Sequence, residues 1–258
     1  MKFKRTVFLP ILTVESFSLT SIRIYFRLAL YILRTFFMPT TYPTRVKICC
    51  ISSKEEADLA IRYGASALGL VSEMPSGPGV ISNEQITKIA AQIPPGITKV
   101  LLTSRQTSAT IISQVKMWPI NAIQIVDKLI DEGYDVIRTA LPAVSIIQVI
   151  HVTGENAITE AEAVAPFVDA VLLDSGNPDL HLKELGGTGR THNWQTSREI
   201  VQRLDKPVFL AGGLNAENVH KAVEAVHPFA VDVCSGVRTN GRLDEDKLSR
   251  FMQQVKQS

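Results

Sequence analysis

Short runs of apolar, mostly β-branched residues alternate with amphipathic segments from residue 45 to the C-terminus. The short runs are typical of buried strands in a parallel sheet, and the amphipathic segments are typical of helices that cover such a sheet. The predicted strands are 46–51, 67–72, 97–103, 121–126, 145–152, 169–174, 207–213 and 229–235. The predicted helices are about 53–63, 83–92, 108–118, 131–141, 156–167, 194–204, 215–226 and 244–256.

Eight strand–helix units in about 215 residues predict an α/β protein with a (β/α)8, or TIM-barrel, fold. Local signals agree with the pattern: Ser53 and Glu56 have capping-box spacing, and Gly64 ends the first predicted helix. We therefore predict one barrel domain at 44–258 and a non-barrel N-terminal extension at 1–43. Functional residues are then expected at the C-terminal ends of the strands and in the loops that follow.

Residues 1–37 carry apolar clusters interrupted by Pro10 and by arginines. No run reaches the roughly 18–20 apolar residues that a membrane span needs, and the pattern of a secretory signal is absent. Three interpretations stay open: a start at Met38, an organelle-targeting leader, and an amphipathic appendage. The expected location is cytoplasmic, or an organelle if the leader is genuine.

The composition is that of an ordinary globular protein, with 45% hydrophobic and 20% charged residues among 258. The net charge of +2 comes from the first 45 residues, so it gives no reason to expect nucleic-acid binding. No membrane contact is expected for the barrel. The three cysteines, Cys49, Cys50 and Cys234, lack zinc-site spacing and fit a reduced compartment, so no metal is expected.

Two residues at strand ends are candidates for acid–base chemistry. Lys47 and Cys49 share one face of the strand 46–51, and a lysine is poorly suited to the helix layer. Cys49 is therefore predicted to point into the barrel and Cys50 to pack under the helices, away from any substrate. Asp174 ends the apolar run 170–173, where a carboxyl group can serve as the acid to a thiol base. The alternatives are a small core residue for Cys49 and a loop cap for Asp174.

Glycines follow the seventh and eighth predicted strands, where barrels of this kind commonly bind phosphate. Glycine lets the backbone approach an anion closely. The predicted phosphate-binding residues are Gly212, Gly213, Ser235 and Gly236.

A second glycine-rich stretch, 186–194, follows the sixth strand. It could fold over a ligand beside Asp174 through Gly187, Gly189 and Arg190, or it could be a plain surface loop. Asp127, after the fourth predicted strand, is a candidate for the rim of the barrel or a helix cap.

Five segments, in the expected order, resemble phosphoribosylanthranilate isomerases of tryptophan biosynthesis. The segments are KICCI, GASALGLVS, LLDS with GGTGRTHNW, LAGGLNAENV and VDVCSGVR, and the resemblance covers about residues 45–255. The corresponding family motifs are KICGI, GADALGFVF, LLD with GGTGKxFDW, LSGGLxxENV and VDVSSGVE.

The resemblance implies an aldose–ketose isomerase, which is an intramolecular oxidoreductase, acting on N-(5-phosphoribosyl)anthranilate. The Amadori rearrangement would yield 1-(o-carboxyphenylamino)-1-deoxyribulose 5-phosphate, with Asp174 as general acid and Cys49 as general base. It implies no cofactor, a small phosphorylated substrate as the partner, and a monomer or homodimer.

The sequence departs from the family at the position after the base, where Cys50 replaces glycine, and in the loop after the second strand. That loop usually carries an arginine suited to the anthranilate carboxylate and here reads SGPGVI. Strand four ends QIVD in place of QLHG. Arg190 or Arg238 is a possible replacement cation. The alternative functions are an isomerase of another phosphorylated sugar amine and a non-catalytic phosphate-binding barrel.

Overall fold

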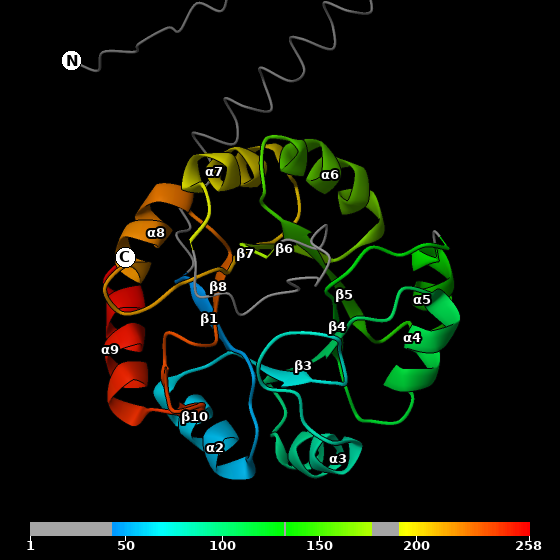
Figure 1. Ribbon diagram of the computed structural model, residues 1–258, viewed down its shortest axis with the longest axis horizontal. Coiled ribbons are helices and arrows are strands. Elements are labelled where there is room, and N and C mark those ends of the chain that lie inside the picture. Colours follow the sequence, from blue (N-terminus) through cyan, green and yellow to red (C-terminus); the bar gives the residue numbers. More distant parts are fainter. Residues whose placement is uncertain (1–42, 132, 177–190) are drawn as a thin grey trace, which may run out of the picture. The chain divides into compact units, whose positions relative to one another are not determined.

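The computed structural model describes residues 43–131, 133–176 and 191–258. Eight parallel strands close into a barrel in sequence order, and β8 pairs with β1. The helices form a ring outside the strands (Figure 1), which confirms the predicted (β/α)8 barrel. The strands are β1 Arg45–Ile48, β2 Ala67–Val71, β3 Thr98–Thr103, β4 Ala122–Ile125, β5 Ser145–His151, β6 Ala170–Asp174, β7 Val208–Leu210 and β8 Ala230–Val233. The helices are α2 Lys54–Tyr63, α3 Asn83–Gln92, α4 Ser108–Val115, α5 Tyr134–Ala140, α6 Asn156–Val164, α7 Trp194–Arg203, α8 Val219–Val226 and α9 Glu245–Lys256.

The predicted extension at 1–43 lies almost wholly outside the described residues. Its three interpretations, the domain boundary and the cellular location therefore stay predictions. Within the described ranges, no helix has both the length and the apolar character needed to cross a membrane.

Alternation along the strands separates an inner from an outer apolar layer. Val100 and Leu102 of β3 belong to the cluster inside the barrel, together with Ile147 and Val149 of β5. Their neighbour Leu101 belongs to the larger cluster between strands and helices. This period of two is the geometry of a pleated strand that is buried on both faces.

The first helix begins and ends close to where its sequence signals place it. The Ser53 side chain accepts a hydrogen bond from the backbone N–H of Glu56, and Gly64 adopts a left-handed φ of 102° after the last turn. The Glu56 carboxylate, however, accepts from the N–H of Ser52 at 3.0 Å, so the reciprocal half of the capping box is shifted by one residue.

Two local predictions were wrong. Helix α5 begins at Tyr134 and not at Asp131, because Asp131 instead accepts hydrogen bonds from the N–H and hydroxyl of Ser108 at the start of α4. Helix α8 begins at Val219, because Asn215 forms a turn ahead of it. Residues 238–243, which lie outside the eight predicted strands, form a hairpin of β9 Arg238–Thr239 and β10 Arg242–Leu243. Its tip, Asn240–Gly241, has positive φ at both residues, as tight hairpins favour.

Candidate active site

A cavity at the C-terminal ends of the strands collects most of the predicted site residues. Its volume is about 660 Å³ including its open mouth. Of the predicted residues, its lining includes Cys49, Asp174, Gly212, Gly213 and Ser235. The strand order thus brings together residues at the ends of β1, β6, β7 and β8 that are far apart in the sequence.

Cys49 lies directly after β1, where the strand pairing with β8 extends by one more hydrogen bond, from Cys49 N–H to Val233 O at 2.9 Å. Its side chain is buried in the inner cluster, as predicted. Cys50 was predicted to face away from the cavity, and this was wrong. A left-handed φ of 63° turns the chain at Cys50 and keeps its thiol in the cavity lining beside Cys49.

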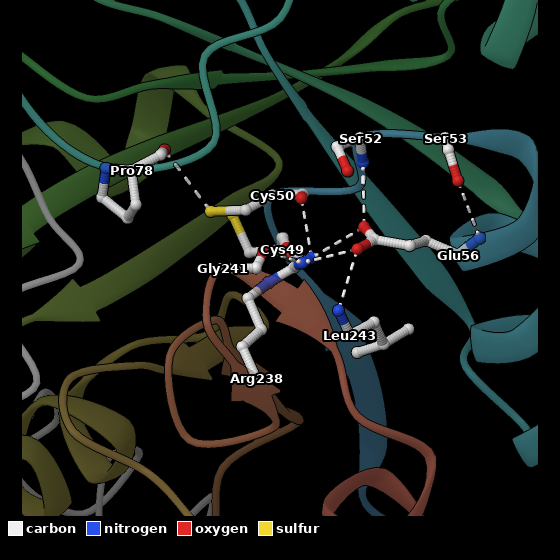
Figure 2. A network of polar contacts seen from close by, with 9 residues as sticks. All are labelled: Cys49, Cys50, Ser52, Ser53, Glu56, Pro78, Arg238, Gly241 and Leu243. Carbon is white, nitrogen blue, oxygen red and sulfur yellow. Dashed lines mark hydrogen bonds and ion pairs between the residues drawn. The ribbon is translucent and has the colours of Figure 1, made fainter.

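Arg238 holds this turn in place. Its guanidinium donates to the carbonyl oxygens of Cys49 at 3.0 Å and of Cys50 at 2.6 Å. The same group forms an ion pair with Glu56 at 2.9 Å, and Figure 2 shows the Glu56 carboxylate between Arg238 and the N–H groups of Ser52 and Leu243. Burial raises the pKa of Glu56, but these hydrogen bonds outweigh burial and hold it below its usual range. The Arg238 guanidinium is thus bonded to the backbone after β1 and to Glu56, and it does not line the cavity. This argues against its suggested role as the cation that binds the substrate.

A buried ion pair lies inside the barrel next to the cavity. Lys47, which is fully buried, donates from Nζ to Asp232 Oδ1 at 2.8 Å. Burial lowers the pKa of Lys47, but the attraction of Asp232 outweighs it, and the net pKa lies above the usual value. Lys47 also interacts electrostatically with Cys49, and Asp232 lines the cavity. Neither member of the pair was predicted as part of the site.

Asp174 ends β6 and is buried at the cavity wall. Burial is the main cause that raises its pKa, and the nearby charge of Asp232 adds to the effect. A hydrogen bond from Ser175 N–H at 2.8 Å, together with His151 and Lys47, opposes the rise without cancelling it. A carboxyl group in such surroundings keeps its proton to higher pH, which suits a general acid.

The loops after β7 and β8 meet through a bridge between Asn215 and Gly236. Gly212 and Gly213 have left-handed φ of 84° and 61°. A Cβ atom on Gly236 would lie 1.9 Å from the Leu214 oxygen, so this contact is open to glycine alone. Gly236 therefore joins the two loops, while the other three predicted phosphate-binding residues line the cavity.

The loop after β2 packs against Cys50. The Cys50 thiol donates to Pro78 O at 3.6 Å, and a Cβ atom on Gly79 would lie 2.4 Å from that of Cys50. No lysine or arginine occurs among the described residues that line the cavity. The described part of the site therefore offers apolar walls and backbone amides, but no free cation.

Gln124 of β4 also went unrecognised as a site residue. It is 4% exposed and lines the cavity, and its Oε1 has no hydrogen-bond partner in the described part of the chain. Its inward position follows from the alternation along 121–126, which was the available signal. Asp127 is buried outside the cavity lining, where its Oδ1 accepts from Lys128 N–H at 2.8 Å.

Gly187, Gly189 and Arg190 lie outside the described residues. His192, at the end of that stretch, bonds through Nε2 to Ser197 Oγ at 2.6 Å. Burial lowers its pKa to about 4, so the ring is neutral at physiological pH. A Cβ atom on Gly212 would lie 3.0 Å from its Nδ1, which places His192 against the loop after β7.

Across 43–131, 133–176 and 191–258, no cluster of three or more histidine, cysteine, aspartate or glutamate residues has the arrangement of a metal site.

Comparisons with known proteins agree with this geometry. The family model described as N-(5'phosphoribosyl)anthranilate (PRA) isomerase matches residues 46–254. The N-(5'-phosphoribosyl)anthranilate isomerase of Methanocella arvoryzae is 35% identical over 214 residues, which are 83% of this chain and 98% of that protein. The enzyme of the same name from Halobacterium salinarum is 36% identical over 213 residues, 81% of this chain and 94% of its own.

Solved structures give the same result. Phosphoribosylanthranilate isomerase from Thermotoga maritima is 30% identical with a TM-score of 0.70, and the match covers 83% of this chain and 100% of that one. A phosphoribosylanthranilate isomerase in complex with reduced 1-(o-carboxyphenylamino)-1-deoxyribulose 5-phosphate is 29% identical, with a TM-score of 0.68 and the same coverage. The chain therefore belongs to the N-(5'-phosphoribosyl)anthranilate isomerase family.

Proposed function

We propose that this protein catalyses the Amadori rearrangement of N-(5-phosphoribosyl)anthranilate to 1-(o-carboxyphenylamino)-1-deoxyribulose 5-phosphate, a step of tryptophan biosynthesis. The observation that carries the proposal is a thiol and a carboxyl group, Cys49 and Asp174, in the lining of one cavity of a family member. The reaction moves hydrogen within one molecule, so no external oxidant or reductant is consumed.

Asp174 acts first, as the general acid. It gives its proton to the ring oxygen of the ribose as the bond between that oxygen and C1 breaks, and the nitrogen lone pair forms a C1=N bond, so that the open chain carries a protonated imine (an iminium). The raised pKa of Asp174 lets the carboxyl group keep its proton to a higher pH than an ordinary aspartate, which suits this role.

Cys49 then acts as the general base. Its thiolate takes the proton from C2, and the electrons of that bond form C1=C2 while those of the C=N bond neutralise the iminium nitrogen, which gives an enolamine. Tautomerisation of the enolamine, with protonation at C1, gives the C2 ketone. The ammonium of Lys47 lies close enough to Cys49 to interact with it electrostatically.

The phosphate binds at the loops that follow β7 and β8. Left-handed φ at Gly212 and Gly213 and the absence of side chains leave their backbone open to the cavity. The aromatic ring of the substrate faces the apolar side chains of Met74, Leu102 and Leu172 across the cavity. The substrate is thereby placed with its sugar between the thiol and the carboxyl group.

A second candidate is an isomerase of another phosphorylated sugar amine. It is favoured by one observation, which is that no lysine or arginine occurs among the described lining residues to pair with an anthranilate carboxylate. A carboxylate-free substrate, N-(5-phosphoribosyl)aniline, separates the two. Comparable kcat/KM for both compounds would favour the second candidate.

The direct test is conversion of N-(5-phosphoribosyl)anthranilate by the purified full chain, followed by loss of anthranilate-type fluorescence. Growth of a tryptophan auxotroph that lacks this isomerase is the matched test in cells. Conversion no faster than the uncatalysed rate, together with no growth, would refute the proposal. Light scattering of the same preparation tests the prediction of a monomer or homodimer.

A further inference from the structure

Three positions at which the chain departs from the family motifs lie together beside the cavity. Cys50 stands where the family has glycine, Cys234 where it has serine, and Arg238 where it has glutamate. Cys50 and Cys234 both line the cavity, as does Cys49, and all three cysteines are free. Two cysteines have thus replaced smaller or oxygen-bearing residues at places that are distant in sequence and adjacent in space.

Backbone geometry brings these two thiols together. β1 and β8 are parallel neighbours, and Ile48 is in register with Val233. One residue further on, Cys49 N–H bonds to Val233 O, so the β1 end runs alongside Cys234. The left-handed turn at Cys50 then directs its side chain into the cavity, where Cys50 and Cys234 both contribute to the lining and lie close enough for each to shift the pKa of the other.

The surroundings give the thiols of Cys50 and Cys234 different pKa values and different exposure. The contact with Cys50 lowers the pKa of Cys234, burial opposes this, and the positive charge of Arg238 lowers it further. Contacts with Cys234 and Cys49 raise the pKa of Cys50. Cys234 is partly exposed whereas Cys50 is 5% exposed. Because the thiolate is the reactive form, Cys234 is the first of the pair to react with a reagent that enters the cavity.

We propose that Cys234 and Cys50 form a reversible disulfide in response to hydroperoxides. The Cys234 thiolate attacks one peroxide oxygen, the O–O bond breaks, and the departing oxygen leaves as water or alcohol after taking a proton. The resulting sulfenic acid is attacked by the sulfur of Cys50, which loses its proton as the S–S bond forms and a second molecule of water leaves. The two thiols give up two electrons, and these reduce the peroxide.

The disulfide changes the site that contains it. Cys50 loses the hydrogen that its thiol donates to Pro78 O, which releases the contact between the β1 end and the loop after β2. The new bond also ties the β1 end to the residue before Ser235, between the base and the phosphate-binding loop. Small displacements of such groups cost much of the rate of an enzyme, so activity falls on oxidation and returns on reduction.

The effect on activity rests on the proposed function, whereas the disulfide can be detected without it. The reduced full chain is treated with hydrogen peroxide, the remaining thiols are alkylated, and the peptides are mapped by tandem mass spectrometry. A peptide pair joined through Cys50 and Cys234 is expected in the wild type and in Cys49→Ser, and it is expected to be absent from Cys50→Gly and Cys234→Ser. A link through Cys49, or sulfinic acid at Cys234 without any link, would overturn the proposal.

Activity is measured in parallel, each variant being compared with its own untreated sample. Peroxide is expected to lower wild-type activity about tenfold or more, with recovery in dithiothreitol. Cys50→Gly and Cys234→Ser, which restore the family residues, are expected to keep most of their activity. Equal losses of activity after peroxide treatment in all three proteins would show that Cys49 is the target of peroxide and would overturn the regulatory role of the disulfide. If the untreated chain has no isomerase activity, the proposed function fails while the peptide map still tests the thiol pair.

Discussion

Removal of the ammonium of Lys47 is expected to destabilise the barrel strongly. In Lys47→Met, Asp232 keeps its negative charge at 7% side-chain exposure and loses its partner at 2.8 Å. Two unit charges at that distance attract each other by about 6 kcal/mol at an effective dielectric constant of about 20. Breaking one side of a buried pair typically costs about 3–5 kcal/mol, because a charge is left buried without compensation. For a domain of this size, that corresponds to a fall in Tm of very roughly 6–20 °C.

Thermal and urea unfolding of the wild type, Lys47→Met and Lys47→Met/Asp232→Leu provide the assay. The double variant is expected to recover much of the lost stability, since replacing both charges by apolar side chains is often neutral. Its isomerase activity is expected to stay low, because Asp174 and Cys49 both interact with the pair. A loss below about 1 kcal/mol in Lys47→Met, the size of an exposed ion pair, would refute this reasoning.

Three further predictions concern the cavity. Asp232→Asn removes a negative charge that raises the pKa of Asp174. The pH at which activity falls on the alkaline side should therefore move down. A kcat–pH profile whose alkaline side is the same as in the wild type would contradict this. Gly212→Ala forces a Cβ atom into a backbone with φ of 84°, 3.0 Å from His192 Nδ1. It should lower the free energy of unfolding by about 1–2 kcal/mol and raise KM. The control Gly64→Ala, at φ of 102°, should lower stability and leave KM unchanged. Gln124→Leu removes an amide oxygen that has no hydrogen-bond partner in the described chain. Stability measured by urea unfolding should therefore be kept, while kcat/KM falls about tenfold. A loss of stability with unchanged kcat/KM would mean that Gln124 is structural.

The barrel was predictable because its signals are local. Each strand is a short apolar run with a period of two, and the helix ends at Ser53 and Gly64 are set by capping chemistry within a few residues. One error came where a side chain has a distant partner. Asp131 would cap its own helix on local grounds, but it bonds to Ser108, which is 23 residues earlier in the sequence. Such competition depends on tertiary structure and leaves no trace in a local pattern.

The candidate site was predictable for residues at the ends of strands. Cys49 and Asp174 were found because polar or reactive groups at the ends of barrel strands face one edge. Cys50 was misplaced because strict alternation was extended through a residue whose left-handed φ ends the strand. The Lys47–Asp232 pair joins residues that are 185 apart in sequence, and the Arg238–Glu56 pair joins residues that are 182 apart. Only the closed barrel brings those charges together.

The assignment of Cys49 as base and Asp174 as acid is the central claim. It is tested most directly by the kcat of Cys49→Ala and Asp174→Asn at saturating N-(5-phosphoribosyl)anthranilate, with binding of reduced 1-(o-carboxyphenylamino)-1-deoxyribulose 5-phosphate as a check on the cavity. Each substitution is expected to lower kcat by about 10²–10⁴-fold while binding of the analogue stays within about threefold of the wild type. A kcat within about threefold of the wild type for either variant would contradict the assignment of that residue.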